Sequence, residues 1–194
     1  MTHIVTNPFF PTLNILLISP STLTMNDMVL STHALGGATA ALLFPHHPVI
    51  AFTAGFLSHF LLDAIPHWHY ELRSLKKPSG NPMDYYFVSD KRLLRDFLMA
   101  ASDAALGFLV LLPIMAFMPF DIGQAIFWGA VGGIMPDGLQ VVYYAFRNSP
   151  IKYLQRFHKW IHARARLDDK PLVGVGAQLI LIAIFFFLIV RFLV

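Results

Sequence analysis

Residues 48–67 read PVIAFTAGFLSHFLLDAIPH, a stretch that is almost entirely apolar and yet carries two histidines and an aspartate. The part Pro48–Pro66 is long enough to cross a bilayer as a helix, which takes about 20 residues. His59, Asp63 and His67 are spaced i, i+4 and i+8, so a helix places all three on one face. The stretch therefore predicts a transmembrane helix that carries a polar site.

Further apolar stretches lie on both sides of this one. They are Met28–Phe44, Leu94–Met118, Ile122–Phe146 and Leu172–Val194. Of the 194 residues only 13% are charged, against roughly 25% in soluble domains. Together these features predict an all-α fold, a polytopic transmembrane helical bundle of about five spans. We expect residues 28–194 to form a single transmembrane helical domain, preceded by a surface or disordered leader at 1–27.

Basic residues gather in the two long connections, 67–95 and 147–170, whereas the short connections 44–48 and 118–121 carry no lysine or arginine. By the positive-inside rule, the N-terminus and both long connections are cytoplasmic and the C-terminus is external. Aromatic and basic residues alternate within 147–170, which predicts an amphipathic helix in the cytoplasmic interface. The alternative is a basic connector that only fixes topology. In this pattern the net charge of +3 reports orientation and gives no sign of a nucleic-acid partner.

Ionisable residues inside the apolar stretches are costly, about 2.5–3.5 kcal/mol for an aspartate at a helix centre, and they usually mark a site. Those present are His33, His59, Asp63, Asp103 and Asp137, with His67 at the end of its span. All six are residues that commonly bind metal, and there is no lysine or arginine among them. All lie toward the cytoplasmic ends of their spans. The chain has no cysteine, so a metal site must use imidazole and carboxylate groups. We therefore expect these side chains to meet in one cavity, where His69 is an alternative to His67.

Two other features bear on the packing of this cavity. Gly36-Gly37 and the glycines at 129, 132 and 133 predict that neighbouring helices approach closely. His158 and His162 are again spaced i, i+4, on the predicted interfacial helix below the same leaflet.

Four short motifs together resemble the signature set of a known family. The motifs are Thr32-His33, Ser58-His59-Phe60-Leu61-Leu62-Asp63, Met135-Pro136-Asp137 and His158-Lys159-Trp160-Ile161-His162. They resemble the predicted membrane-bound metal-dependent hydrolases, the LexA-regulated inner-membrane group, which is distantly similar to zinc-dependent phospholipase C. Leu139 stands where that family has a second aspartate, and the order of the motifs differs.

The resemblance implies a multi-pass protein of the inner membrane. It makes metal ligands of His33, His59, Asp63, Asp137, His158 and His162, to which the spacing argument adds His67.

These observations favour a membrane-embedded hydrolase that cleaves a phosphoester or similar bond of a lipid-like substrate at the cytoplasmic face. Imidazole-rich sites favour Zn²⁺, with Mn²⁺ as an alternative, and the number of ligands predicts more than one ion. Asp103 is the predicted general base. Two other classes use the same residues: a transporter of metal ions or protons, and a non-catalytic membrane protein clamped by metal. The lipid bilayer is the one other partner expected, and nothing in the sequence indicates an oligomeric state.

Overall fold

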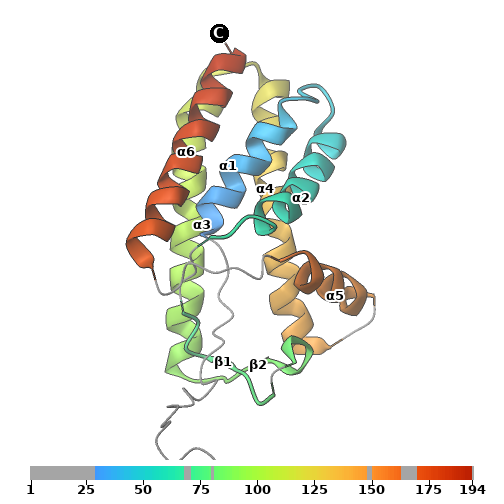
Figure 1. Cartoon of the computed structure of the whole chain (residues 1–194). Helices are drawn as coiled ribbons and strands as arrows, with labels where there is room; N and C mark the ends of the chain where they lie inside the picture. Colours follow the sequence, from blue (N-terminus) through green and yellow to red (C-terminus); the bar gives the residue numbers. More distant parts are fainter. Residues whose placement is uncertain (1–28, 68–70, 80, 148–149, 163–169, 194) are drawn as a thin grey trace, which may run out of the picture.

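The computed structural model describes residues 29–67, 71–79, 81–147, 150–162 and 170–193, which form an all-α fold with one short hairpin (Figure 1). The elements in chain order are α1 (Leu30–Ala41), α2 (Pro48–Asp63), β1 (Leu75–Lys76), the 3-10 turn η1 (Pro82–Asp84), β2 (Tyr86–Phe87), α3 (Lys91–Phe117), α4 (Phe120–Phe146), α5 (Ile151–Ile161) and α6 (Pro171–Leu193). The leader expected at 1–27 lies outside the described residues.

Helices α3, α4 and α6 are long and apolar enough to cross a membrane. Each of the first two has 27 residues, a length of about 40 Å at 1.5 Å per residue. Large apolar side chains on α3 and α6 face outward, among them Phe97, Leu109 and Leu179. A soluble protein rarely exposes so much apolar surface, whereas lipid covers it without cost. These helices mark the chain as a membrane protein.

Helices α1 and α2 are shorter than the expected spans, with 12 and 16 residues. Their lengths of about 18 and 24 Å fall short of a hydrocarbon core of about 30 Å. The expectation of five spans is therefore not confirmed within the described residues. Helix α1 is buried on nearly every side and lies among α2, α3, α4 and α6 (Figure 1). Its apolar sequence is that of a core helix, because protein rather than lipid surrounds it.

Glycines allow α1, α2 and α4 to pack backbone against backbone, as the sequence predicted. A Cβ atom on Gly37 of α1, or on Gly55 of α2, would overlap the backbone oxygen of Gly129 in α4. One turn further along α4, a Cβ on Gly133 would overlap the backbone oxygen of His33. Small residues of this kind are the usual means by which membrane helices approach closely. The close approach brings polar side chains on the three helices within reach of one another.

The long connections lie at the same end of the molecule, and the short connections lie with the end of α6 at the other (Figure 1). At the first end the segment with β1 and β2 is tied to α4 through Arg147, whose backbone is left-handed with φ 55°. Its guanidinium donates to the carbonyl oxygens of Met83, Asp84 and Tyr85 at 3.0, 3.1 and 2.8 Å. Those bonds hold a conformation that is uncommon for a residue other than glycine.

Helix α5 packs against α4 at this end and is the helix predicted within 147–170. At helical spacing its residues form three faces: an aromatic face with the exposed Tyr153 and Trp160, a basic face with Lys152, and a face with the buried Gln155 and His158. The last face is turned toward the protein, so α5 delivers a histidine to the interior while its aromatic face stays exposed.

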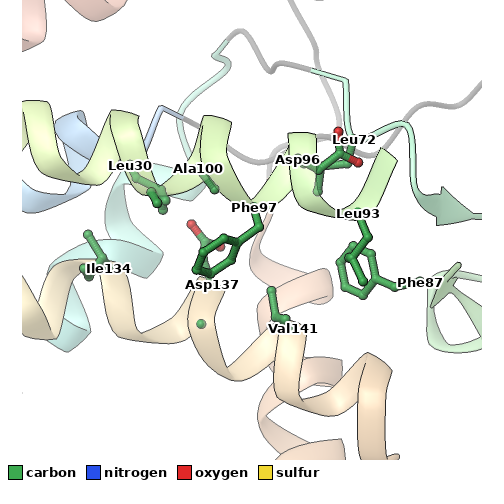
Figure 2. A pocket seen from close by; sticks show the side chains of 12 residues that line it. Leu30, Leu72, Phe87, Leu93, Asp96, Phe97, Ala100, Ile134, Asp137 and Val141 are labelled. Atoms are coloured by element: carbon green, nitrogen blue, oxygen red, sulfur yellow. The ribbon is translucent and has the colours of Figure 1, made fainter. Parts of the chain in front are cut away.

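An apolar cavity of about 340 Å³ lies between the first half of α3 and the second half of α4. Figure 2 shows Phe97 and Ala100 of α3 facing Asp137 and Val141 of α4 across it. Asp137 is thus shared between this cavity and the polar interior on the other side of α4.

Candidate metal centre

All the side chains predicted as metal ligands come together in three overlapping groups. The ligand atoms within each group lie within 4.8 Å of one another. The groups are His33, His59 and Asp63; His59, Asp137 and His158; and Asp63, His67 and His162. They come from α1, α2, α4 and α5 and from the chain just after α2 and α5. These groups could hold a metal ion. The alternative ligand, His69, lies outside the described residues.

Four ligand atoms in the middle of the cluster form a compact set. His59 Nε2 lies 3.3 Å from His158 Nε2, 3.2 Å from Asp63 Oδ2 and 3.6 Å from Asp137 Oδ1. His158 Nε2 lies 2.5 Å from Asp63 Oδ2 and 3.8 Å from Asp137 Oδ1. A tetrahedral zinc with ligands at 2.0–2.2 Å separates its donor atoms by about 3.3–3.6 Å. The four other separations are close to those of one tetrahedral shell, whereas His158 and Asp63 lie at hydrogen-bond distance and would have to move apart to bind the same ion.

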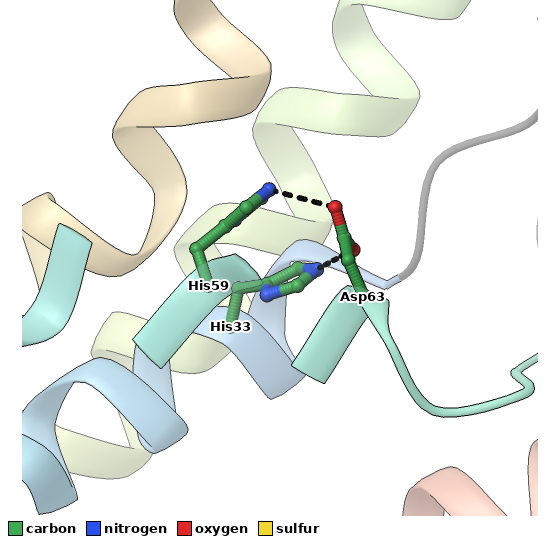
Figure 3. Close-up of side chains that lie close together, drawn as sticks. All are labelled: His33, His59 and Asp63. Atoms are coloured by element: carbon green, nitrogen blue, oxygen red, sulfur yellow. Dashed lines mark ion pairs between the residues drawn. The ribbon is translucent and has the colours of Figure 1, made fainter. Parts of the chain in front are cut away.

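Asp63 connects this set to His33 (Figure 3). Its Oδ2 faces His59, while its Oδ1 lies 3.4 Å from Nε2 of His33. Neither ring nitrogen of the buried His33 has a hydrogen-bond partner among the described residues. A buried polar atom left in this state costs about 1–3 kcal/mol. A cation bound by His33 and Asp63 would remove that cost, so the donors here fit a metal.

The third group lies at the edge of the cluster, where α2 ends and α5 ends. The rings of His67 and His162 have centroids 5.0 Å apart, and both have a ligand nitrogen near Asp63. His162 is only half-buried, unlike the other ligands. This group therefore contains the most exposed of the candidate ligands.

Backbone carbonyls fix which nitrogen of two rings can bind metal. His59 Nδ1 donates to the carbonyl of Gly133 at 2.7 Å, and His67 Nδ1 donates to that of Ile65 at 2.5 Å. A carbonyl can only accept, so the proton sits on Nδ1 and Nε2 is directed to the cluster. Such second contacts orient metal-binding histidines and raise their affinity.

Burial further favours the neutral, ligating form of the histidine from α5. Loss of solvent lowers the pKa of His158, although Asp63 beside it acts in the opposite direction. His33, His59, Asp63 and His158 are all almost completely buried. Ionisable groups gathered without water are stabilised by pairing or by binding a metal ion.

Asp103 is placed differently from the expectation of one common cavity. Its carboxylate accepts hydrogen bonds from Leu30 N at 2.5 Å, Ser31 N at 3.3 Å and Ser31 Oγ at 2.8 Å. It thereby caps the first turn of α1, whose own N-cap residue Val29 makes no side-chain cap. The sequence does not show which side of α3 meets α1. Its role as a general base stays a prediction.

A buried glutamine pair holds α5 against α4 and was missed by the sequence reading. Gln155 Nε2 donates to Gln140 Oε1 at 2.9 Å and to the Tyr144 hydroxyl at 3.1 Å. Gln140 comes three residues after Asp137, and Gln155 three residues before His158, so each glutamine lies one turn from a ligand. The signal in the sequence is Gln140, a polar residue inside an apolar span that does not titrate.

No protein-family model, curated protein or solved structure matches the chain. The positions of the candidate ligands in the structure are therefore what indicates a metal centre.

Proposed function

We propose that the protein is a membrane-embedded metal-dependent hydrolase that cleaves a phosphoester or similar bond of a lipid-like substrate. The observation that carries this proposal is the overlap of the ligand groups: Asp63 belongs to two of them, and so does His59. Shared carboxylates and closely spaced imidazoles are what a centre with more than one ion requires. A single structural ion would need four ligands rather than seven.

The ligand chemistry supports zinc, with manganese as the alternative. Imidazole suits zinc better than magnesium or calcium, and the distances from His59 Nε2 to the other donor atoms of the compact set are close to those of a tetrahedral shell. A bound ion of this kind would lower the pKa of a coordinated water toward about 7 and polarise a phosphoryl oxygen.

The protein's own residues would prepare the site for that chemistry. Gly133 orients the ring of His59, and Asp63 lies between His33 on one side and His59 and His158 on the other. Groups that are fixed before substrate binds need no reorganisation during reaction. An ion held by the three-ligand group with His33, or by the one with His162, would keep one coordination position for water or substrate, as catalytic zinc sites do.

The location that we propose for this activity is the cytoplasmic face of the inner membrane. The cluster lies on the side of the helical bundle where the long, basic connections are found. Basic residues on that side, such as Lys152 and Lys159 of α5, would attract an anionic headgroup.

The test is metal analysis and hydrolysis by protein purified without chelator, with a chromogenic phosphodiester and phosphatidylglycerol vesicles as substrates. His59→Ala and Asp63→Ala should each lose most of the bound metal and all metal-dependent hydrolysis. His46→Ala is the matched control, because His46 is exposed and pairs with Asp121 at the other end of the molecule. If both His59→Ala and Asp63→Ala keep their full metal content, the proposal is wrong.

A metal clamp is the second candidate, favoured by the almost complete burial of the four central ligands. Structural zinc sites are closed, and their binding energy is folding energy. In that case removing metal from the wild-type protein would lower its melting temperature strongly, and no substrate would be turned over. For an open catalytic centre we expect hydrolysis to disappear with a smaller loss of stability.

A further inference from the structure

The cavity between α3 and α4 has the lining of a hydrocarbon site. Its walls include Leu30, Leu93, Phe97, Ile134 and Val141 (Figure 2). Ligand pockets are mostly apolar, with a few polar groups that fix orientation, and span roughly 300–1,000 Å³. At about 340 Å³ this cavity falls at the small end of that range.

The two carboxylates that line the cavity differ in what they can do. Asp96 is already engaged, since it accepts from Ser74 N and Ser74 Oγ at 2.7 Å each and from Arg95 at 3.0 Å. Those bonds attach the segment before β1 to α3. Asp137, in contrast, lies between the cavity and the metal centre, with Oδ1 3.6 Å from His59 Nε2. The cavity is thus apolar along its length and ends at a metal-ligand residue.

The cavity also reaches the lipid-facing surface. Phe97 and Val141 belong to its lining and are 66% and 48% exposed. Both residues sit on helices that are long enough to span the membrane. An occupant could therefore enter sideways from the bilayer without crossing water.

We propose that this cavity takes one hydrocarbon chain of a membrane phospholipid, whose phosphate headgroup then lies at the metal centre beyond Asp137. The volume suits one chain rather than two. Burial of methylene groups in the cavity would position the phosphoester against the ligands, so the apolar tail selects the substrate and the cluster acts on it. This proposal rests on the proposed function, but chain binding can be measured without catalysis.

Gly138 offers a clean steric test. It lines the cavity, and a Cβ atom added to it meets nothing within 4 Å, so the side chain of Gly138→Leu would enter empty space. Gly176 of α6 is the matched control, because its added Cβ also meets nothing and it does not line the cavity. The probe is phosphatidylglycerol with a diazirine at the end of one acyl chain, photolysed with the full-length protein in lipid nanodiscs.

Adducts are mapped by mass spectrometry on wild-type protein and on both variants. We expect labelling of Ala100, Ala101 and Val141 to exceed that of Leu98 and Leu109, which are exposed on α3 outside the cavity. In Gly138→Leu it should fall about tenfold, as expected when roughly two buried methylene groups are displaced. Gly176→Leu should leave it unchanged.

Equal labelling along α3, or labelling that Gly138→Leu does not reduce, would overturn the proposal. If Gly138→Leu fails to fold, Ala101→Leu fills the same cavity from α3 and is read in the same way. Metal-depleted protein separates the two proposals. Cavity labelling that persists without metal, in a protein that hydrolyses nothing when metal is restored, would reject the enzyme and retain the lipid site.

Discussion

The contact between His59 and Gly133 links helix packing directly to the candidate metal centre. Gly133 is a glycine because its Cα faces the backbone oxygen of His33, and its carbonyl accepts the Nδ1 proton of His59. One residue of α4 thus sets the distance to α1 and the tautomer of a ligand on α2. Gly133 thus both permits the close packing of the helices and accepts the hydrogen bond that orients His59.

Gly133→Ala should therefore damage the site although it removes no ligand. The added Cβ overlaps the backbone oxygen of His33, and overpacking of this kind costs about 1–3 kcal/mol. Separation of α1 from α4 would also move His33 of α1 away from Asp137 of α4. We expect a lower melting temperature and a loss of bound metal, measured on the same preparation. Gly176→Ala, where the added atom meets open space, should change neither; unchanged metal content in Gly133→Ala would show that the helices need not approach so closely.

The role of Asp103, as general base or as cap of α1, can be tested by a substitution that removes its charge and keeps its shape. Asp103→Asn retains an oxygen that accepts from the first turn of α1, but it cannot act as a base. If Asp103 is the general base, the variant should keep its metal and lose hydrolysis by about 10²–10⁴-fold. Loss of metal together with stability would instead identify Asp103 as the cap that positions His33, and hydrolysis that stays intact would exclude it as the base.

At the scale of elements, α5 depends on its glutamine contact with α4. Gln155 and Gln140 are both buried, and their hydrogen bond lies one turn from His158 and Asp137. In Gln155→Leu the oxygen of Gln140 keeps only the longer bond from the Tyr144 hydroxyl at 3.4 Å, and that hydroxyl loses its own donor. Weakened satisfaction of buried polar groups costs up to about 1–3 kcal/mol. We expect weaker metal binding as α5 loosens, measured by competition with a chelator. The double variant with Gln140→Leu should be less destabilised than the sum of the two single variants, because their effects are coupled. Additive losses would show that the pair does not hold α5.

An apolar stretch of sequence predicts that a helix is there, but it does not say whether lipid or protein surrounds that helix. The run Leu94–Met118 predicted α3 within a few residues of Lys91–Phe117, since both lipid and protein favour apolar side chains. The same run cannot tell lipid from protein, so the buried α1 was expected to be a span. The ligand list came from residue types that are expensive in an apolar helix, and spacing placed His59 and Asp63 on one face. Contacts between elements, such as those of Asp103 and Gln155, depend on how helices rotate against each other, which no single run encodes.

At the scale of the whole molecule, the connections and the cluster share one side. Helix α2 runs toward this side and ends at Asp63, and α4 passes Asp137 on its way to the same side (Figure 1). The hairpin of β1 and β2 and helix α5, which belong to the two long connections, lie on this side as well (Figure 1). The aromatic face of α5, with Tyr153 and Trp160, is exposed, as in helices that lie on a membrane surface. For the proposed hydrolase, membrane orientation would therefore decide which compartment supplies the metal and the headgroup.

Orientation is tested by reporters fused to the full-length chain at the two ends of the molecule. Ser79 lies in the exposed turn between β1 and η1, where it donates to Asp84 at 2.7 Å, and α6 ends on the opposite side. Lysine and arginine gather in the long connection that includes Ser79, so a reporter there should read cytoplasmic. A reporter after α6 should read external. A third reporter in the short loop at His46 should agree with the one after α6, since both lie at the same end. If the reporters at His46 and after α6 both read cytoplasmic and the one at Ser79 reads external, the candidate metal centre lies at the outer face. Its substrates would then come from the outer leaflet. Disagreement between His46 and the C-terminus would show that α6 does not cross the membrane alongside α3 and α4.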